Sequence, residues 1–119
     1  MELTKDLIFQ ADDIKKEKVH VPEWNGDVYV KMMTAAERDR FESDMFEIKN
    51  GKAVTKNVEL MRAKLVGLTA CGSDGVLLFS SEDIPKLATK SASAIDRLFA
   101  VAQKLNRLTK EDVDELTKN

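Results

Sequence analysis

Two runs rich in valine and aromatic residues, joined by an Asn-Gly dipeptide, constrain the fold of this chain more than any other feature. Residues 18–24 and 27–32 flank Asn25-Gly26. Asn-Gly is the dipeptide that best fits a two-residue type I′ turn, because both residues tolerate a positive φ. The pattern predicts a β-hairpin over about residues 18–32. An isolated hairpin is marginally stable in water, so we expect it to pack on another part of the chain.

The alternation within the two runs predicts which side of the hairpin is buried. A two-residue turn at Asn25-Gly26 places Val21 opposite Val30 and Val19 opposite Met32. The face expected to pack on helices carries Val19, Val21, Val28, Val30 and Met32. The other face carries His20, Pro22, Trp24 and Tyr29. Pro22 has no N–H to donate, so its strand is expected to lie at an edge or to bend there.

Capping residues and apolar side chains at helical spacing predict helices in most of the remaining chain. Thr34 and Glu37 have the spacing of a capping box, which begins a helix over about residues 35–49. Its apolar stripe consists of Phe41, Met45 and Ile48. Further helices are expected over about residues 57–71, 82–89, 92–106 and 110–117.

Two shorter segments complete the predicted architecture. Thr4 can cap a short helix that carries Leu7, Ile8 and Phe9. The run Val76–Phe79 is a candidate short third strand or a buried extended connector. We therefore predict a single domain over residues 1–119, of the α+β class and mainly α-helical, in which an N-terminal β-hairpin packs on a small helical bundle.

The balance of charge argues against several partners and compartments. The chain has 19 Lys and Arg residues against 21 Asp and Glu residues, whereas nucleic-acid-binding domains usually show a basic excess or a basic face. No apolar run approaches the roughly 18 residues that a membrane span needs, and the first residues do not resemble a secretion signal. We expect a cytoplasmic protein that binds neither nucleic acid nor membrane and is not secreted.

Few residues in the chain have the chemistry that catalysis needs. His20 is the single histidine and Cys71 the single cysteine, and we interpret them as a surface strand residue and a small apolar helix residue. The carboxylates alternate with basic residues and lack the spacing of a calcium loop. We therefore expect no enzyme, no metal site and no cofactor.

Apolar side chains without an assigned core partner are the remaining candidates for a site. Trp24 and Tyr29 lie on the outer face of the predicted hairpin, and Phe46 lies off the apolar stripe of its helix. Exposed apolar clusters mark interfaces, and Trp and Tyr are favoured as anchors. We predict Trp24, Tyr29 and Phe46 as partner-binding residues, with a second small core as the alternative.

The order of these elements resembles the tail assembly chaperones of long-tailed bacteriophages and prophages. The resemblance begins with Val21-Pro-Glu-Trp-Asn-Gly-Asp-Val-Tyr-Val-Lys31 and Met33-Thr-Ala-Ala-Glu-Arg-Asp-Arg-Phe-Glu42. It continues through Arg62–Val66, Gly72–Gly75, Leu78–Ile84 and Lys90–Phe99, and covers about residues 17–119.

The resemblance implies a non-enzymatic role in the bacterial host cytoplasm. Such chaperones bind the long tape-measure protein, keep it soluble and help to recruit major tail protein subunits, and self-association into a homo-oligomer is compatible with this role. Two other functions remain open: a structural phage tail or connector component, and a small helical adaptor protein of the host.

Overall fold

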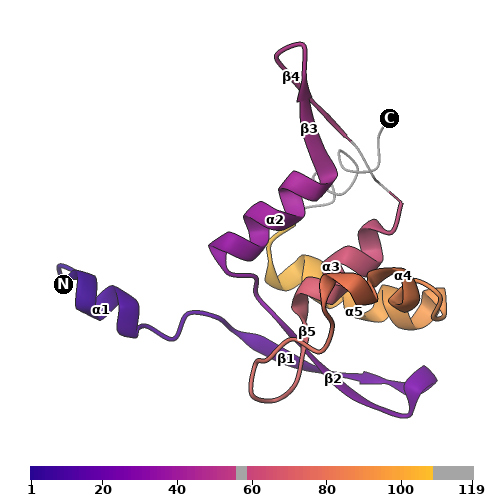
Figure 1. Cartoon of the computed structure of the whole chain (residues 1–119). Coiled ribbons are helices and arrows are strands. Elements are labelled where there is room, and N and C mark those ends of the chain that lie inside the picture. The colour runs from indigo at the N-terminus through magenta and orange to yellow at the C-terminus, as the bar shows by residue number, and fades with distance from the viewer. Residues whose placement is uncertain (56–58, 109–119) are drawn as a thin grey trace.

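A small antiparallel sheet packs against helices in the computed structural model, which describes residues 1–55 and 59–108. The fold is therefore of the α+β class, as predicted. The elements are α1 (Lys5–Gln10), β1 (Lys16–Val21), the 3-10 helix η1 (Pro22–Trp24), β2 (Gly26–Lys31), α2 (Ala35–Met45), β3 (Phe46–Lys49), β4 (Lys52–Thr55), α3 (Met61–Thr69), β5 (Ala70–Cys71), η2 (Ser81–Asp83), α4 (Ile84–Leu87) and α5 (Ala92–Leu105). Figure 1 shows α1 and the β3–β4 hairpin projecting away from the sheet and the α3–α5 helices.

The hairpin β1–β2 forms, but the two-residue turn predicted at Asn25-Gly26 is wrong. The register pairs Val19 with Val28 and Val21 with Gly26. The two strands are therefore joined by residues 22–25 and not by a two-residue turn. Pro22 begins η1, and Asn25 closes the connection in the left-handed region at φ 53°. Proline presets φ for such a turn and removes a donor that the sheet would need, which explains why the strand ends before Pro22.

The four valines of the hairpin lie on the face that packs on the core, as predicted, despite this change of register. The observed pairing is displaced by an even number of residues from the predicted one, and side chains alternate with a period of two, so each valine keeps its face. Val21 and Val30 are fully buried, and Val19 and Val28 are half-buried against the core. Met32 was wrongly placed on this face, because β2 ends at Lys31 and the next core side chain is Met33.

The predicted helix over residues 35–49 is shorter than expected, because α2 ends at Met45. The capping box of Thr34 and Glu37 is present, and Phe41 and Met45 are buried. Ile48, the third member of the predicted stripe, lies in β3 with 72% of its surface exposed.

A second hairpin, β3–β4, replaces the end of the predicted helix. Lys49 pairs with Lys52, and Asn50 and Gly51 between them have φ values of 52° and 76°. Positive φ at both residues is the requirement of a type I′ turn. The Asn-Gly turn that the sequence predicted at residues 25–26 therefore exists at residues 50–51 instead.

The third strand of the sheet is β5, which pairs with β2. The helix predicted over residues 57–71 is the shorter α3, and its last two predicted residues form this strand. The candidate strand Val76–Phe79 contributes one isolated bridge, from Leu77 to Cys71. Within α3, Gly67 is buried directly beneath the Ile84 side chain, so a small residue at this position lets α3 and α4 approach closely.

The last described helix, α5, lies along the β1–β2 hairpin and completes the core. It spans Ala92–Leu105, where the sequence predicted a helix over about residues 92–106, and Ser91 caps its start. The helix predicted over residues 82–89 is divided into η2 and α4. The helix predicted over residues 110–117 lies outside the described residues. Large side chains that are almost completely buried include Val21, Val30, Phe41, Met45, Leu65, Val66 and Leu98.

The buried side chain of Asn106 joins the end of α5 to the connection between β2 and α2. Its Oδ1 accepts from the Met33 N–H at 2.7 Å, and its Nδ2 donates to the Ala102 carbonyl at 2.8 Å and to the Lys31 carbonyl at 3.4 Å. A buried amide that satisfies several backbone groups at once rigidifies the junction that it spans.

Lys31 and Glu37 form an ion pair beside this junction. The ammonium group of Lys31, with a side chain only 8% exposed, donates to Glu37 Oε1 and to the Met32 carbonyl. Burial raises the pKa of Glu37, but hydrogen bonds from Lys31 and from the Thr34 backbone outweigh it and hold the pKa below its ordinary value. The pair thus connects β2 to the first turn of α2.

Replacing Asn106 by Ala is expected to lower the free energy of unfolding by about 2–3 kcal/mol, because the Met33 N–H and the Lys31 carbonyl lose a buried partner. Urea unfolding followed by circular dichroism measures this loss. Lys104→Ala, at an exposed position in the last turn of α5, is the control and should change stability little. Equal stabilities of the two variants would contradict the proposed role of the amide.

Glu37→Gln is expected to destabilise the protein near neutral pH and to lose this effect in acid. The folded-state pKa of Glu37 is lowered, so its carboxylate stabilises the fold above the ordinary glutamate pKa, and this stabilisation disappears as pH falls through the folded pKa. Chemical unfolding of the wild type and the variant at pH 7 and below about pH 4 should show a difference in the free energy of unfolding that becomes smaller as the pH is lowered. A difference that is constant across this range would contradict the ion-pair explanation.

Candidate functional site

His20 and Cys71, which the sequence analysis interpreted as structural residues, lie in different strands: His20 in β1, as predicted, and Cys71 in β5 instead of a helix. His20 is exposed and its Nδ1 lies 2.8 Å from Asp27 Oδ1, a hydrogen bond that lowers the pKa of Asp27. Cys71 is buried, and burial raises the pKa of its thiol. Residues 1–55 and 59–108 contain no group of three or more His, Cys, Asp or Glu that could hold a metal ion. No helix in these ranges is long and apolar enough to cross a membrane.

An apolar groove of about 550 Å³ opens beside the tip of the first hairpin. We call it the Trp24 groove, and it is lined by Trp24, Leu78, Phe79, Asp83, Lys86, Leu87 and Lys90. Leu78 is 52% exposed at its rim, while Leu87 is buried. The groove therefore offers aromatic and aliphatic surface to an apolar partner, with the amines of Lys86 and Lys90 beside it.

An ion pair connects the hairpin tip to α5 next to this groove. Arg97 Nε lies 2.9 Å from Glu23 Oε1 and 3.2 Å from Oε2. The hydrogen bond from Arg97 is the main cause that lowers the pKa of Glu23. Because η1 carries both Glu23 and Trp24, this pair helps to hold the indole at the groove.

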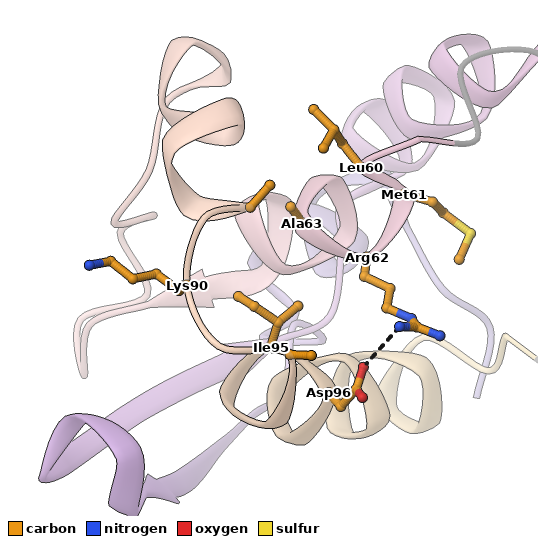
Figure 2. A pocket seen from close by; sticks show the side chains of 9 residues that line it. Leu60, Met61, Arg62, Ala63, Lys90, Ile95 and Asp96 are labelled. Atoms are coloured by element: carbon orange, nitrogen blue, oxygen red, sulfur yellow. Dashed lines mark ion pairs between the residues drawn. The ribbon is translucent and has the colours of Figure 1, made fainter.

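A second groove, of about 400 Å³, lies between α3, α5 and the segment that follows α4. We call it the Leu60 groove, and it is lined by Leu60, Met61, Arg62, Ala63, Ala88, Lys90, Ala92, Ile95 and Asp96. Figure 2 shows Arg62 directed towards Asp96, with their ion pair across one side of the groove. Lys90 lines both grooves. Ala63, Ala88 and Ala92 contribute only small side chains to the lining, so the backbone of a docked helix could approach it closely.

Leu60 combines two features that are unfavourable for folding. Its backbone is left-handed, with φ 64° and ψ 13°, and its side chain is 42% exposed although it is apolar. A left-handed conformation costs an L-residue roughly 1–2 kcal/mol. Leu60 also occupies the N-cap of α3 without a side-chain hydrogen bond to the helix. Local departures of this kind are typical of functional positions.

The three predicted partner-binding residues do not share one surface. Trp24 lines the Trp24 groove and is half-buried against the core. Tyr29 is half-buried in β2, opposite Lys18 and Cys71. Phe46 is half-buried at the start of β3 and also packs against the core. Figure 1 shows β3 on the other side of the molecule from the tip of the first hairpin.

The sequence analysis did not identify Leu60 or Leu78 as site residues. In the helix predicted over residues 57–71, the apolar residues at helical spacing are Val58, Met61, Leu65 and Leu68. Leu60 lies off this stripe, so the criterion that selected Phe46 would have selected Leu60 as well. Leu78 lies in the run Val76–Phe79, which the sequence predicts as a short strand or a buried extended connector, and neither alternative identifies Leu78 as an exposed site residue. Further exposed apolar residues are Leu7, Ile8 and Phe9 of α1, Ile48 and Val76.

Comparisons with known proteins point to one family. The family model described as phage tail assembly chaperone matches residues 4–119. Two solved chains match the fold, and one of them is the tail assembly chaperone of bacteriophage HK97. The match has a TM-score of 0.58 and 19% sequence identity, and covers 84% of this chain and 94% of the other. A search of curated protein sequences gives no match.

Leu60→Asn is expected to raise the free energy of unfolding by about 0.5–1 kcal/mol, because asparagine tolerates the left-handed conformation better than leucine. Thermal unfolding followed by circular dichroism measures the change. Leu60→Ile is the matched control and should lower stability, since a branched Cβ is strained at positive φ. If both variants unfold at the wild-type temperature, the conformation of Leu60 has no energetic cost.

Proposed function

The chain belongs to the family of phage tail assembly chaperones, and from this premise we propose that it binds the tape-measure protein and keeps it soluble during tail assembly. We propose that it also helps to recruit the major tail protein. Binding is non-covalent, and the protein acts in the host cytoplasm, without enzymatic activity and without a cofactor, for a phage or a prophage.

The open, apolar Trp24 groove is the observation that carries this proposal. An extended, helical tape-measure protein exposes apolar stripes before it is enclosed by the tail tube, and such stripes aggregate unless they are covered. Helices bind proteins by placing an apolar face into a groove of this kind. The exposed Leu78 and the indole of Trp24 supply the contact surface, and Leu87 contributes to the lining.

Trp24 is the proposed anchor in this groove, and Tyr29 and Phe46 are proposed as additional contacts outside it. Single grooves bind weakly, but many copies along one partner gain from avidity, so modest individual contacts suffice. Self-association of neighbouring copies into a homo-oligomer belongs to the same proposal, because it increases the number of grooves that one partner meets.

Co-expression with a candidate tape-measure protein, a long helical protein encoded by a neighbouring gene, tests the proposal. We expect that candidate to be soluble only in the presence of this protein, with several copies per partner by size-exclusion chromatography with light scattering. Leu78→Ser is expected to weaken the complex about tenfold by removing an exposed apolar contact, with Val76→Ser as the control at an exposed apolar position that does not line the groove. Trp24→Ala should weaken binding too, but it also removes packing from a half-buried position.

An insoluble partner beside free chaperone would contradict the proposal. Mass spectrometry of purified particles would then separate the two alternatives. Retention in the particle would indicate a structural tail or connector component, and a host-encoded partner without neighbouring tail genes would indicate a helical adaptor.

A further inference from the structure

We propose that the N-terminal arm, residues 1–13, binds in the Leu60 groove of a second copy of this chain. The inference rests on the self-association included in the proposed function, and it is independent of which tail protein the Trp24 groove binds. The proposed function names no binding partner for the Leu60 groove, and the N-terminal arm of a second copy is the partner that we propose.

The arm presents apolar side chains that are not covered by the rest of the chain. Leu7, Ile8 and Phe9 are 43%, 53% and 79% exposed, and α1 has no buried residue. Figure 1 shows α1 pointing away from the sheet and the other helices. Three adjacent apolar side chains that remain in water are unusual unless a partner covers them.

The shortness of α1 is a second reason to expect a partner. The helix has six residues, with Thr4 accepting a hydrogen bond from the Leu7 N–H at its start. Isolated helices shorter than about 12–15 residues are marginal in water. Docking of these apolar side chains would supply the tertiary packing from which short helices gain most of their stability.

The Leu60 groove suits such a helix in shape. Ala63, Ala88 and Ala92 line it with small side chains, which lets a helix backbone approach closely. Figure 2 shows Leu60 at one edge of the set of lining side chains, and this apolar side chain is 42% exposed. A contact with the arm would bury this side chain and so explain why a strained, exposed leucine occupies the position.

Charge also favours this pairing. The arm carries four carboxylate side chains, on Glu2, Asp6, Asp12 and Asp13, against one basic side chain, that of Lys5. The groove is lined by two cations, Arg62 and Lys90, and by one anion, Asp96, which pairs with Arg62. An acidic arm beside a groove with a surplus cation gains attraction on encounter and in the complex.

The geometry of the chain favours a second copy over the chain's own groove. Ile95 and Asp96 of the groove lie next to Arg97, which pairs with Glu23 at the hairpin tip, whereas the arm is attached at Lys16, the other end of β1. The linker Ala11–Lys15 spans at most about 18 Å, and β1 alone extends about 20 Å. The linker alone is therefore too short to run back along the whole of β1, and a neighbouring copy has no such constraint.

Sedimentation velocity over a range of protein concentrations tests the proposal with the full chain. We expect species heavier than the 13.4 kDa monomer to form as concentration rises. The combined variant Leu7→Ser, Ile8→Ser, Phe9→Ser and the variant Leu60→Asn should each raise the midpoint concentration about tenfold or more. Leu60→Asn is expected to stabilise the fold, and its thermal unfolding, measured in parallel, distinguishes weakened association from unfolding.

Leu78→Ser, in the Trp24 groove, is the matched control and should leave self-association unchanged. Lys90→Glu should weaken association, and adding Asp12→Lys and Asp13→Lys should restore it. Mixing Gln10→Cys protein with Ala92→Cys protein should give a disulfide-linked heterodimer on mild oxidation, since the native Cys71 is buried.

Three results would overturn the proposal. The first is a monomer at all concentrations, which would also remove self-association from the proposed function. The second is association that the arm variant does not weaken, which would place the interface elsewhere. The third is association that is weakened by Leu78→Ser and not by Leu60→Asn, which would place the arm in the Trp24 groove. Binding of the tape-measure protein is measured separately, so its failure is distinguishable from all three.

Discussion

The fold depends on the attachment of α5 along the β1–β2 hairpin at both of its ends. Near its start, Arg97 pairs with Glu23 at the hairpin tip, and beyond its last turn the buried amide of Asn106 binds the backbone at Lys31 and Met33. Between these two points, Leu98 and Ala102 are completely buried with Val21 and Val30 in the same core. The Trp24 groove and the Leu60 groove both lie near the start of α5, so their geometry follows from this attachment.

The buried valine face of the first hairpin was predictable from the sequence, whereas turn geometry and the exposure of Ile48 were not. The valine face was identified correctly despite a wrong register, because the error was an even number of residues and alternation was preserved. The helix predicted to continue to residue 49 stops at Met45, since Asn50-Gly51 closes a tight hairpin and pairing with β4 replaces helical hydrogen bonds. Each Asn-Gly dipeptide could end a helix or close a hairpin, and only packing of the flanking residues decides between the two.

The candidate site was only partly accessible to sequence reasoning. Trp24 was identified because an aromatic residue on the outer side of a hairpin needs a partner, and it does line a groove. The other lining residues come from segments distant in the chain, and no local pattern brings Leu78 and Leu87 beside Trp24. Leu60 is recognisable by its left-handed backbone, a property that side-chain periodicity does not reveal.

Trp24 is the only tryptophan of the chain, and this has an optical consequence. Its indole is half-buried in the lining of the groove, so the intrinsic fluorescence of the protein originates largely at this one surface. An indole shifts its emission to shorter wavelengths when water beside it is replaced by apolar groups. The chain therefore carries a built-in spectroscopic reporter of groove occupancy, which requires neither a label nor a substitution.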